Sequence, residues 1–340
     1  MYKVLITQSD FGQDRFFSCS IAKLRQHLTL IAPAQSSAMT EDAVIDICFK
    51  QKIEIIVTGW NGSIITPTIL ESAPDLRLIA VAGGAISGHS PELAFKRGIR
   101  YCNCPGAMGW YVAEYALGLI LAMGYEIPYH DRLIKTRHTS VPEEGRYSER
   151  NGYCSTSIIG STVGLIGCGH IARHLIKMLK PFNCRILVYD PYLDDTAAKR
   201  LGVRKTTLKY LLQHTDILSV HAGWTAETAG MIGAKELAYL HDQAIIINTA
   251  RMPIFDEAAL LHEVKQKRLK AALNLVPENP IWFDPELAES RHVYLSGSSA
   301  SVAVRTFRDM GNMLARDIIR FAKHQKMRHE ITSDMLNRMT

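Results

Sequence analysis

The chain has 340 residues, of which 47% are hydrophobic and 21% are charged, and its formal net charge is +6 at pH 7. This length favours two domains over one core, and the mild, scattered charge argues against a nucleic-acid-binding protein. The longest apolar run, at 115–125, is too short to span a bilayer, so no membrane segment is expected. Seven cysteines without paired metal spacing indicate free thiols and no metal site, which is typical of a cytoplasmic protein.

The first third of the chain alternates short β-branched runs with helical stretches. The expected strands are residues 2–7, 28–33, 53–59, 77–83 and 99–104. Helices are expected between them at 40–51 and 90–98, with Thr40 and Ser90 as N-caps. Strands that alternate with helices predict an α/β fold, in which helices cover both faces of a parallel sheet.

A long helical stretch at 109–127 and a polar segment at 139–157 separate this part from a second alternating series. The strands expected in that series are 161–167, 184–190, 216–222, 244–250, 271–276 and 293–296. A last helix is expected at 301–324. The pattern therefore predicts a second parallel sheet.

The second series opens with a glycine-rich loop. Gly167, Gly169 and Ala172 form the pattern G-x-G-x-x-A between a predicted strand and a predicted helix. The first glycine allows a tight turn, the second lets a pyrophosphate approach the backbone, and the alanine permits close packing of helix and strand. The positive end of the helix dipole favours the phosphate charge. This context indicates a dinucleotide site.

An acidic residue stands where such a site needs one. Asp190 ends the next predicted strand, at the place of the usual partner of the ribose 2′-hydroxyl, and Pro191 follows it. No arginine follows closely, so the sequence favours NAD over NADP.

Four further segments resemble the D-isomer-specific 2-hydroxyacid dehydrogenases. They are NCPGAMGWYVAEYALGLIL (103–121), DILSVHAGWTAETAGMI (216–232), IIINTARMPIFDEAAL (245–260) and AALNLVPENP (271–280). The resemblance implies two doubly wound parallel-sheet domains. A Rossmann NAD-binding domain, 108–298, would be inserted in a flavodoxin-like substrate domain, 1–107 plus 299–340. It also implies a homodimer, for which the apolar helix at 112–124 is a candidate interface, although core burial explains that helix equally well.

The resemblance extends the expected cofactor site beyond the glycine loop. The residues expected to bind NAD are Gly167, Gly169, His170, Ile171, Asp190, Pro191, His221, Ala222, Thr228, Thr249, Ala250, Arg251 and Asn274.

Oxidation or reduction at a 2-hydroxy acid sets three tasks for the protein. A cation must hold the carboxylate, a group that titrates near neutral pH must exchange a proton, and a carboxylate should orient that group. The family uses Arg, His and Glu for these tasks. Arg251, in NTARM, fills the first, but Asn279 stands at the position of the Glu and Ser298 at that of the His. We therefore expect Arg251, Asn279 and Ser298 to form an atypical catalytic set.

The expected substrate-binding residues are also altered. The loop GGAISG supplies Gly83, Gly84 and Ala85, whose backbone amides would bind the substrate carboxylate together with Arg251. Met108 replaces a polar side chain of the family motif, and Met252 replaces the glycine after the arginine. Because these changes line one site while the cofactor loop is intact, the site is either rebuilt or retired.

Serine cannot act as a general acid, so a displaced group would be needed for ordinary turnover. Three candidates, His89, Tyr111 and His292, are each more simply explained as a structural or exposed residue. A fourth, Glu278, is adjacent to the family's Glu position, and this shift of one residue should point its side chain elsewhere. The first hypothesis is an NAD-dependent oxidoreductase acting on a small anionic substrate. The alternative is a catalytically retired NAD(H)-binding regulatory or interaction protein, and a third is a conventional dehydrogenase with a displaced acid–base residue.

Overall fold

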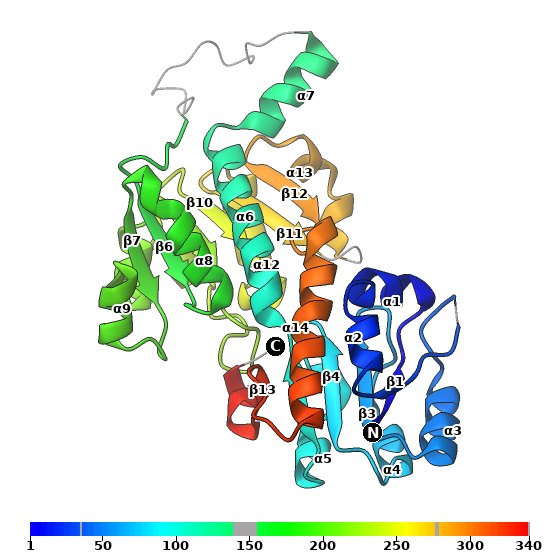
Figure 1. Ribbon diagram of the computed structural model, residues 1–340. Coiled ribbons are helices and arrows are strands. Elements are labelled where there is room, and N and C mark those ends of the chain that lie inside the picture. The colour runs from blue at the N-terminus through cyan, green and yellow to red at the C-terminus, as the bar shows by residue number, and fades with distance from the viewer. Residues whose placement is uncertain (35, 139–154, 276–278, 339–340) are drawn as a thin grey trace. The chain divides into compact units, whose positions relative to one another are not determined.

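The computed structural model describes residues 1–34, 36–138, 155–275 and 279–338 (Figure 1). The contacts divide the chain into two compact units, Met1–Met108 with Val302–Thr340, and Gly109–Ser301. The boundaries expected from the sequence fall one residue before the first division and three residues before the second.

The first unit is built on a six-stranded sheet with the order β13-β5-β4-β3-β1-β2. Its strands are β1 (Lys3–Ile6), β2 (Thr29–Ile31), β3 (Ile55–Gly59), β4 (Leu78–Ala82), β5 (Arg100–Asn103) and β13 (Glu330–Ile331). The five first strands are parallel in the order 2-1-3-4-5, which is the flavodoxin-like arrangement. The edge strand β13 runs antiparallel to β5 and departs from the fully parallel sheet that was expected.

Helices pack against this sheet. They are α1 (Asp10–Phe17), α2 (Ile21–Arg25), α3 (Glu41–Gln51), α4 (Pro67–Ser72), α5 (Pro91–Lys96) and α14 (Val304–Ala322). Thr40 caps α3 as predicted, because its hydroxyl accepts a hydrogen bond from the backbone of Ala43 at 3.3 Å. The prediction for Ser90 was wrong: its hydroxyl donates to the carbonyl of Ile65 at 2.9 Å, so α5 begins without a side-chain cap.

The second unit is built on a seven-stranded parallel sheet with the order β12-β11-β10-β9-β6-β7-β8. Its strands are β6 (Thr162–Ile166), β7 (Arg185–Tyr189), β8 (Arg204–Lys205), β9 (Ile217–Val220), β10 (Ile245–Asn248), β11 (Lys270–Leu275) and β12 (Val293–Gly297). Its helices include α7 (Ile127–Arg137), α8 (His170–Leu179), α9 (Asp195–Leu201), α10 (Leu208–Gln213), α11 (Ala234–Leu237), α12 (Glu257–Lys265) and α13 (Pro285–Glu289). The chain leaves the centre of the sheet in both directions, from β6 to β8 and from β9 to β12, as in a Rossmann fold.

The long helix α6 (Pro105–Gly124) begins at the end of the first unit and continues into the second. By length and composition it is the one helix in the described part of the chain that could cross a membrane. Its inner face nevertheless lies in the core of the second unit, where Ala113, Ala116 and Ile120 are fully buried. This burial favours the core role for residues 112–124.

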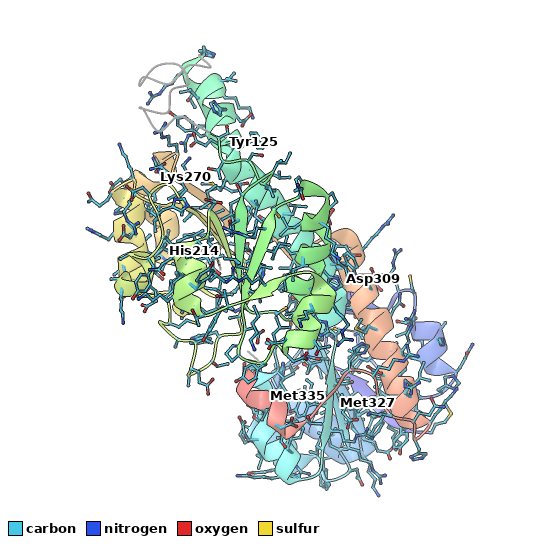
Figure 2. All side chains as sticks on the ribbon, turned by 90° about the vertical axis from the view of Figure 1, so that its left-hand side faces the viewer. Tyr125, His214, Lys270, Asp309, Met327 and Met335 are labelled. Carbon is cyan, nitrogen blue, oxygen red and sulfur yellow. The ribbon has the colours of Figure 1, made fainter. Side chains whose placement is uncertain are left out.

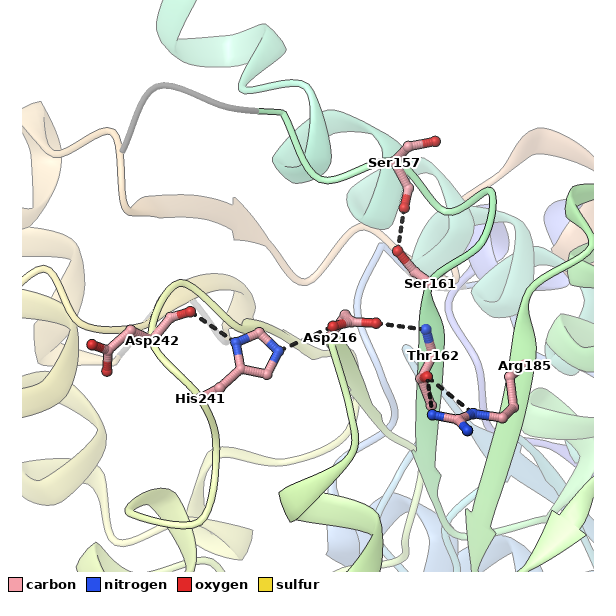
Figure 3. A network of polar contacts seen from close by, with 7 residues as sticks. All are labelled: Ser157, Ser161, Thr162, Arg185, Asp216, His241 and Asp242. Carbon is pink, nitrogen blue, oxygen red and sulfur yellow. Dashed lines mark hydrogen bonds and ion pairs between the residues drawn. The ribbon is translucent and has the colours of Figure 1, made fainter. Parts of the chain in front are cut away.

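Polar contacts fix the amino ends of the second sheet (Figure 3). The carboxylate of Asp216, just before β9, accepts a hydrogen bond from the backbone of Thr162 at 2.7 Å and contacts Nε2 of His241 at 3.1 Å. Arg185, at the start of β7, donates to the hydroxyl of Thr162 at 2.8 Å. These bonds join β6, β7 and β9 at their amino-terminal ends. The opposite side of the sheet, where the carboxyl ends of the strands lie (the carboxyl edge), is left for a binding site.

A buried ion pair ties α7 to the sheet. Lys270 and Glu126 are 1% and 6% exposed, and Nζ of Lys270 lies 2.6 Å from Oε1 of Glu126. Figure 2 marks Lys270 at the start of β11 and Tyr125, the neighbour of Glu126. The pair therefore connects the turn between α6 and α7 to β11.

Candidate functional site

The expected cofactor residues of the second unit lie at or just beyond the carboxyl ends of its strands. This edge is where open α/β sheets bind ligands, at the point where the strand order reverses. Here the reversal falls between β6 and β9. Gly167 follows β6 with φ of +89°, and a Cβ at this position would stand 2.7 Å from the backbone nitrogen of Ala222, which follows β9. Only glycine fits this turn without strain.

The N-terminus of α8 provides room for a phosphate. Gly169 is the N-cap residue, no side chain caps the helix, and no atom lies within 4 Å of where its Cβ would be. His170 and Ile171 form the first turn beyond it. The guanidinium of Arg173 lies beside the loop, since its Nε donates to the carbonyl of Cys168 at 2.9 Å. Sequence reasoning missed Arg173, whose only signal is a basic residue one turn into the helix.

The carboxylate of Asp190 is fastened to the glycine loop. One oxygen accepts a hydrogen bond from the backbone of Cys168 at 2.6 Å, and the other accepts one from the backbone of Tyr192 at 2.7 Å. The carboxylate is thus held at the end of β7, with Pro191 next to it. Burial raises the pKa of the Cys168 thiol, which argues against a reactive thiolate in this loop.

Three buried polar atoms at this edge have no hydrogen-bond partner among the described residues. They are Nδ1 of His221 after β9, Oγ1 of Thr249 after β10 and Oδ1 of Asn274 near the end of β11. Unpaired buried polar atoms are costly and indicate a ligand or water that satisfies them. Because these atoms lie at neighbouring strands, the carboxamide and ribose hydroxyls of one dinucleotide are suitable hydrogen-bond partners for them. His221 is kept neutral, since burial lowers its pKa to about 4.

Two further expected cofactor residues shape loops. The hydroxyl of Thr228 donates to the carbonyl of Gly223 at 2.6 Å and accepts from the backbone of Thr225 at 2.8 Å. The backbone of Ala250 donates to Oδ1 of Asn248 at 3.0 Å. These contacts set the course of the chain beyond β9 and β10.

Arg251 lies in extended backbone just after β10, and its side chain is exposed. Among the described residues its side chain makes a single hydrogen bond, a long one of 3.4 Å from Nη1 to the carbonyl of Ala250, and no ion pair. Met252, the next residue, is buried. The guanidinium is therefore available for an anion at the carboxyl edge.

The other two residues of the expected catalytic set are arranged differently. The side-chain oxygen of Asn279 accepts a hydrogen bond from the backbone of Ile281 at 2.9 Å and caps the short helix η5 (Pro280–Phe283). Its amide nitrogen is what remains for a substrate. Ser298 follows β12 and is exposed. Glu278 lies outside the described residues.

His292 cannot act as the acid–base group at the position of Ser298. It precedes β12, whereas Ser298 follows it, so the strand separates them by about 20 Å at 3.3 Å per residue. Burial lowers the pKa of His292 to about 4, and its Nε2 accepts a hydrogen bond from Nε of Arg291 at 3.3 Å. Both observations give His292 a structural role.

The expected carboxylate loop lies in the first unit, directly after β4. The backbone of Gly83 donates to the carbonyl of Val81 at 2.9 Å, so this amide is engaged within its own turn. The carbonyl of Gly84 accepts a hydrogen bond from the side chain of Asn103 at 2.7 Å, and Sδ of Met108 lies 3.9 Å from where a Cβ on Gly84 would be. The amides of Gly84 and Ala85 are the donors that this loop can offer.

Two more candidates for a displaced acid can be placed. Nδ1 of His89 accepts a hydrogen bond from the backbone of Ile65 at 3.2 Å, and burial lowers its pKa. This imidazole is thus built into the fold of the first unit. Tyr111 lies on α6, half-buried.

The fold and the carboxyl-edge site of the second unit define a dinucleotide-binding α/β protein. Residues 117–297 match the family model described as "D-isomer specific 2-hydroxyacid dehydrogenase, NAD binding domain". The chain belongs to the D-isomer-specific 2-hydroxyacid dehydrogenase family, and its cofactor is NAD(H). The expectation from the sequence segments is confirmed on both points.

Among curated relatives, a D-3-phosphoglycerate dehydrogenase of Archaeoglobus fulgidus is 30% identical over 270 residues, which cover 77% of this chain and 48% of the relative. The chain thus spans about half the length of that relative. A glyoxylate reductase of Thermococcus litoralis is 30% identical over 269 residues, which cover 79% of this chain and 80% of the reductase. Among solved structures, the holo form of Rhodotorula graminis D-mandelate dehydrogenase has a TM-score of 0.83 at 22% identity and covers 98% of each chain. That likeness confirms the α/β fold.

Proposed function

We propose that this protein is an NAD(H)-dependent oxidoreductase that acts on a small anionic substrate, such as a 2-oxo or 2-hydroxy acid, with an atypical active site. Arg251 would hold the substrate carboxylate through its bidentate fork. Asn279, through its amide nitrogen, and Ser298, through its hydroxyl, would hydrogen-bond the substrate.

One observation carries this proposal. An exposed arginine without an ion pair among the described residues follows β10, between the strands that carry the unpaired atoms of His221 and Asn274. A cation at this place beside a nicotinamide site suits an anion that exchanges a hydride with the cofactor. The names of the curated relatives, glyoxylate reductase and D-3-phosphoglycerate dehydrogenase, point to the same chemical class.

The test is steady-state NADH consumption with glyoxylate and larger 2-oxo acids by wild type, Arg251→Ala and Arg251→Lys. Lysine keeps the charge but loses the bidentate geometry, so it should retain part of the activity that alanine loses. NADH affinity is measured by fluorescence for all three, and activities are compared at saturating NADH, because Arg251 also stands among the expected cofactor residues. Full activity of Arg251→Ala would refute the role of the arginine.

A second candidate function has its own support. The side-chain oxygen of Asn279 is spent on a helix cap, and neither Asn279 nor Ser298 titrates near neutral pH. A protein that binds NAD(H) but no longer turns over a substrate would tolerate both changes. For such a regulatory or interaction protein, light scattering should detect an NADH-dependent change in association while no acid consumes NADH.

Assembly and compartment are parts of the same proposal. Large apolar side chains remain exposed along α6, α7 and the turn between them, where Trp110, Tyr125, Ile127 and Ile134 are 46%, 45%, 55% and 51% exposed. A homodimer would cover such side chains, and light scattering would measure its mass. The cysteines in the described part of the chain are free thiols, which suits the reducing cytoplasm.

A further inference from the structure

The structure offers a hydroxyl pair at the place where the family's acid–base residue is missing. Ser299 follows Ser298 in the loop after β12, and its Oγ donates a hydrogen bond of 3.0 Å to the phenol oxygen of Tyr115 on α6. The geometry points to Tyr115 as the proton donor of this site, with Ser299 as the hydrogen-bond donor that stabilises its phenolate. This inference rests on the proposed oxidoreductase function.

The position of Tyr115 is fixed by its helix. The ring is half-buried and packs against the core cluster that contains Ala113, Ala116 and Ile120 of α6. A hydroxyl carried by a packed helix of 20 residues is better positioned than one on a loop. Ser299 itself is exposed at the carboxyl edge, whereas the ring of Tyr115 packs against the core.

Strand pairing places Ser299 just beyond the level of Asn274. In the register of β11 and β12, Asn274 lies opposite Ser296 and Leu275 opposite Gly297. Ser299 is therefore three residues beyond the level of Asn274, a separation of about 10 Å along the strand direction at most. The unpaired, buried Oδ1 of Asn274 marks that level as a ligand-binding one.

The proton balance of a reduction can be written with these groups. NADH, when bound, supplies the hydride to the carbonyl carbon of a 2-oxo acid, and negative charge develops on the carbonyl oxygen. The Tyr115 O–H bond breaks as its proton goes to that oxygen, and the hydrogen bond that Ser299 Oγ donates stabilises the phenolate left behind. Water then returns a proton to the phenolate. A phenol is a far stronger acid than an aliphatic alcohol, so the transfer runs downhill toward the alkoxide.

The first test compares Tyr115→Phe and Ser299→Ala with wild type, on the 2-oxo acid that wild type consumes fastest. Tyr115→Phe should lower kcat by about 10²-fold or more, the usual contribution of a positioned acid. Ser299→Ala should lower kcat by about tenfold, because it removes one hydrogen bond to the phenolate. Both should leave NADH affinity unchanged. Tyr294→Phe is the matched control, because it removes a phenol hydroxyl from the same core cluster.

A rescue variant separates proton donation from packing. Ser298→His, added to Tyr115→Phe, restores an imidazole at the family's position and should recover at least about tenfold in kcat. If Tyr115→Phe keeps wild-type kcat, this inference fails while the oxidoreductase function stands. The inference is equally overturned if the loss cannot be rescued. If wild type consumes no acid, the proposed function and this inference fail together.

A readout without turnover completes the test. Fluorotyrosine incorporated at all tyrosines gives ¹⁹F signals that report on each phenol, and Tyr115→Phe assigns one of them. Addition of NADH with oxamate, an analogue of a 2-oxo acid, should move the Tyr115 signal and not that of Tyr294. A Tyr115 signal that stays in place would overturn the inference.

Discussion

The carboxylate of Asp190 lies 2.6 Å from the backbone nitrogen of Cys168, so the residue that ends β7 is bonded to the glycine loop that ends β6. The same side chain that is expected to receive the ribose hydroxyls therefore also holds the phosphate loop. We therefore expect cofactor binding to depend on the same carboxylate that holds the loop.

Replacement of Asp190 by Ala should weaken NADH binding by about tenfold or more, since a charged hydrogen-bond acceptor contributes about 1.5–3 kcal/mol. Affinity for NADPH should fall less, because its 2′-phosphate gains from removal of a negative charge. Fluorescence titration of both cofactors measures this. Asp195→Asn, on the first turn of α9, is the control and should bind both as wild type does. Equal losses for NADH and NADPH would show that Asp190 acts only through the loop.

Replacement of the two loop glycines by alanine should have different effects, on NADH affinity in one case and on stability in the other. Gly169→Ala puts a methyl group into open space where no atom of the chain lies within 4 Å, so the protein should fold normally but bind NADH about tenfold less tightly. Gly167→Ala forces a Cβ against the backbone of Ala222 at a φ of +89° and should lower the free energy of unfolding by about 1–3 kcal/mol.

Thermal unfolding and fluorescence titration distinguish the two variants. A Gly169→Ala protein with unchanged NADH affinity would mean that the phosphate does not approach the N-terminus of α8.

The buried pair of Lys270 and Glu126 should behave as a unit. Lys270→Met leaves a carboxylate buried without a partner and should cost about 3–5 kcal/mol, whereas the double variant Lys270→Met/Glu126→Gln should recover much of that loss. Urea unfolding measures both. The exposed pair of Lys135 and Asp131 on α7 serves as the comparison, since its loss should cost no more than about 1 kcal/mol. Strictly additive losses in the buried pair would contradict the ion pair.

The buried imidazole of His292 should make the protein sensitive to acid. Burial lowers its pKa from 6.5 to about 4, so the folded state disfavours the charged form. The stability it contributes is complete above pH 6.5 and is lost as the pH falls through 4, which amounts to about 3 kcal/mol.

Urea unfolding at a series of pH values tests this against His292→Gln. The variant should lose less stability than wild type between pH 7 and pH 4, while His262→Gln, an exposed histidine on α12, should follow wild type. Parallel curves for wild type and His292→Gln would show that His292 is not held neutral by burial.

The elements that bury continuous apolar runs could be predicted from the sequence. β4 and β10 are completely buried and match their predicted ranges to within two residues at each end. The two-residue strands β8 and β13 could not be predicted, because β8 is exposed and β13 follows a basic stretch without apolar alternation. The cap at Ser90 failed because its hydroxyl bonds to Ile65, which is distant in the sequence.

The candidate site also has parts that could be predicted from the sequence and parts that could not. The turn at Gly167 could be predicted from the spacing of the glycine motif directly after a strand, because only glycine adopts this tight turn without strain. The cap formed by Asn279 depends on the helix that follows it, and a family motif does not reveal this. The contact between Tyr115 and Ser299 joins residues 184 positions apart, so only the fold brings it to light.

The most direct measurement is NADH consumption by the purified protein with glyoxylate and a series of larger 2-oxo acids, once NADH binding has been established by fluorescence. We expect at least one acid to be reduced with stoichiometric loss of NADH, and Arg251→Ala to abolish this loss. Tight NADH binding without consumption of any acid would contradict the oxidoreductase function and leave the NAD(H)-dependent binding role.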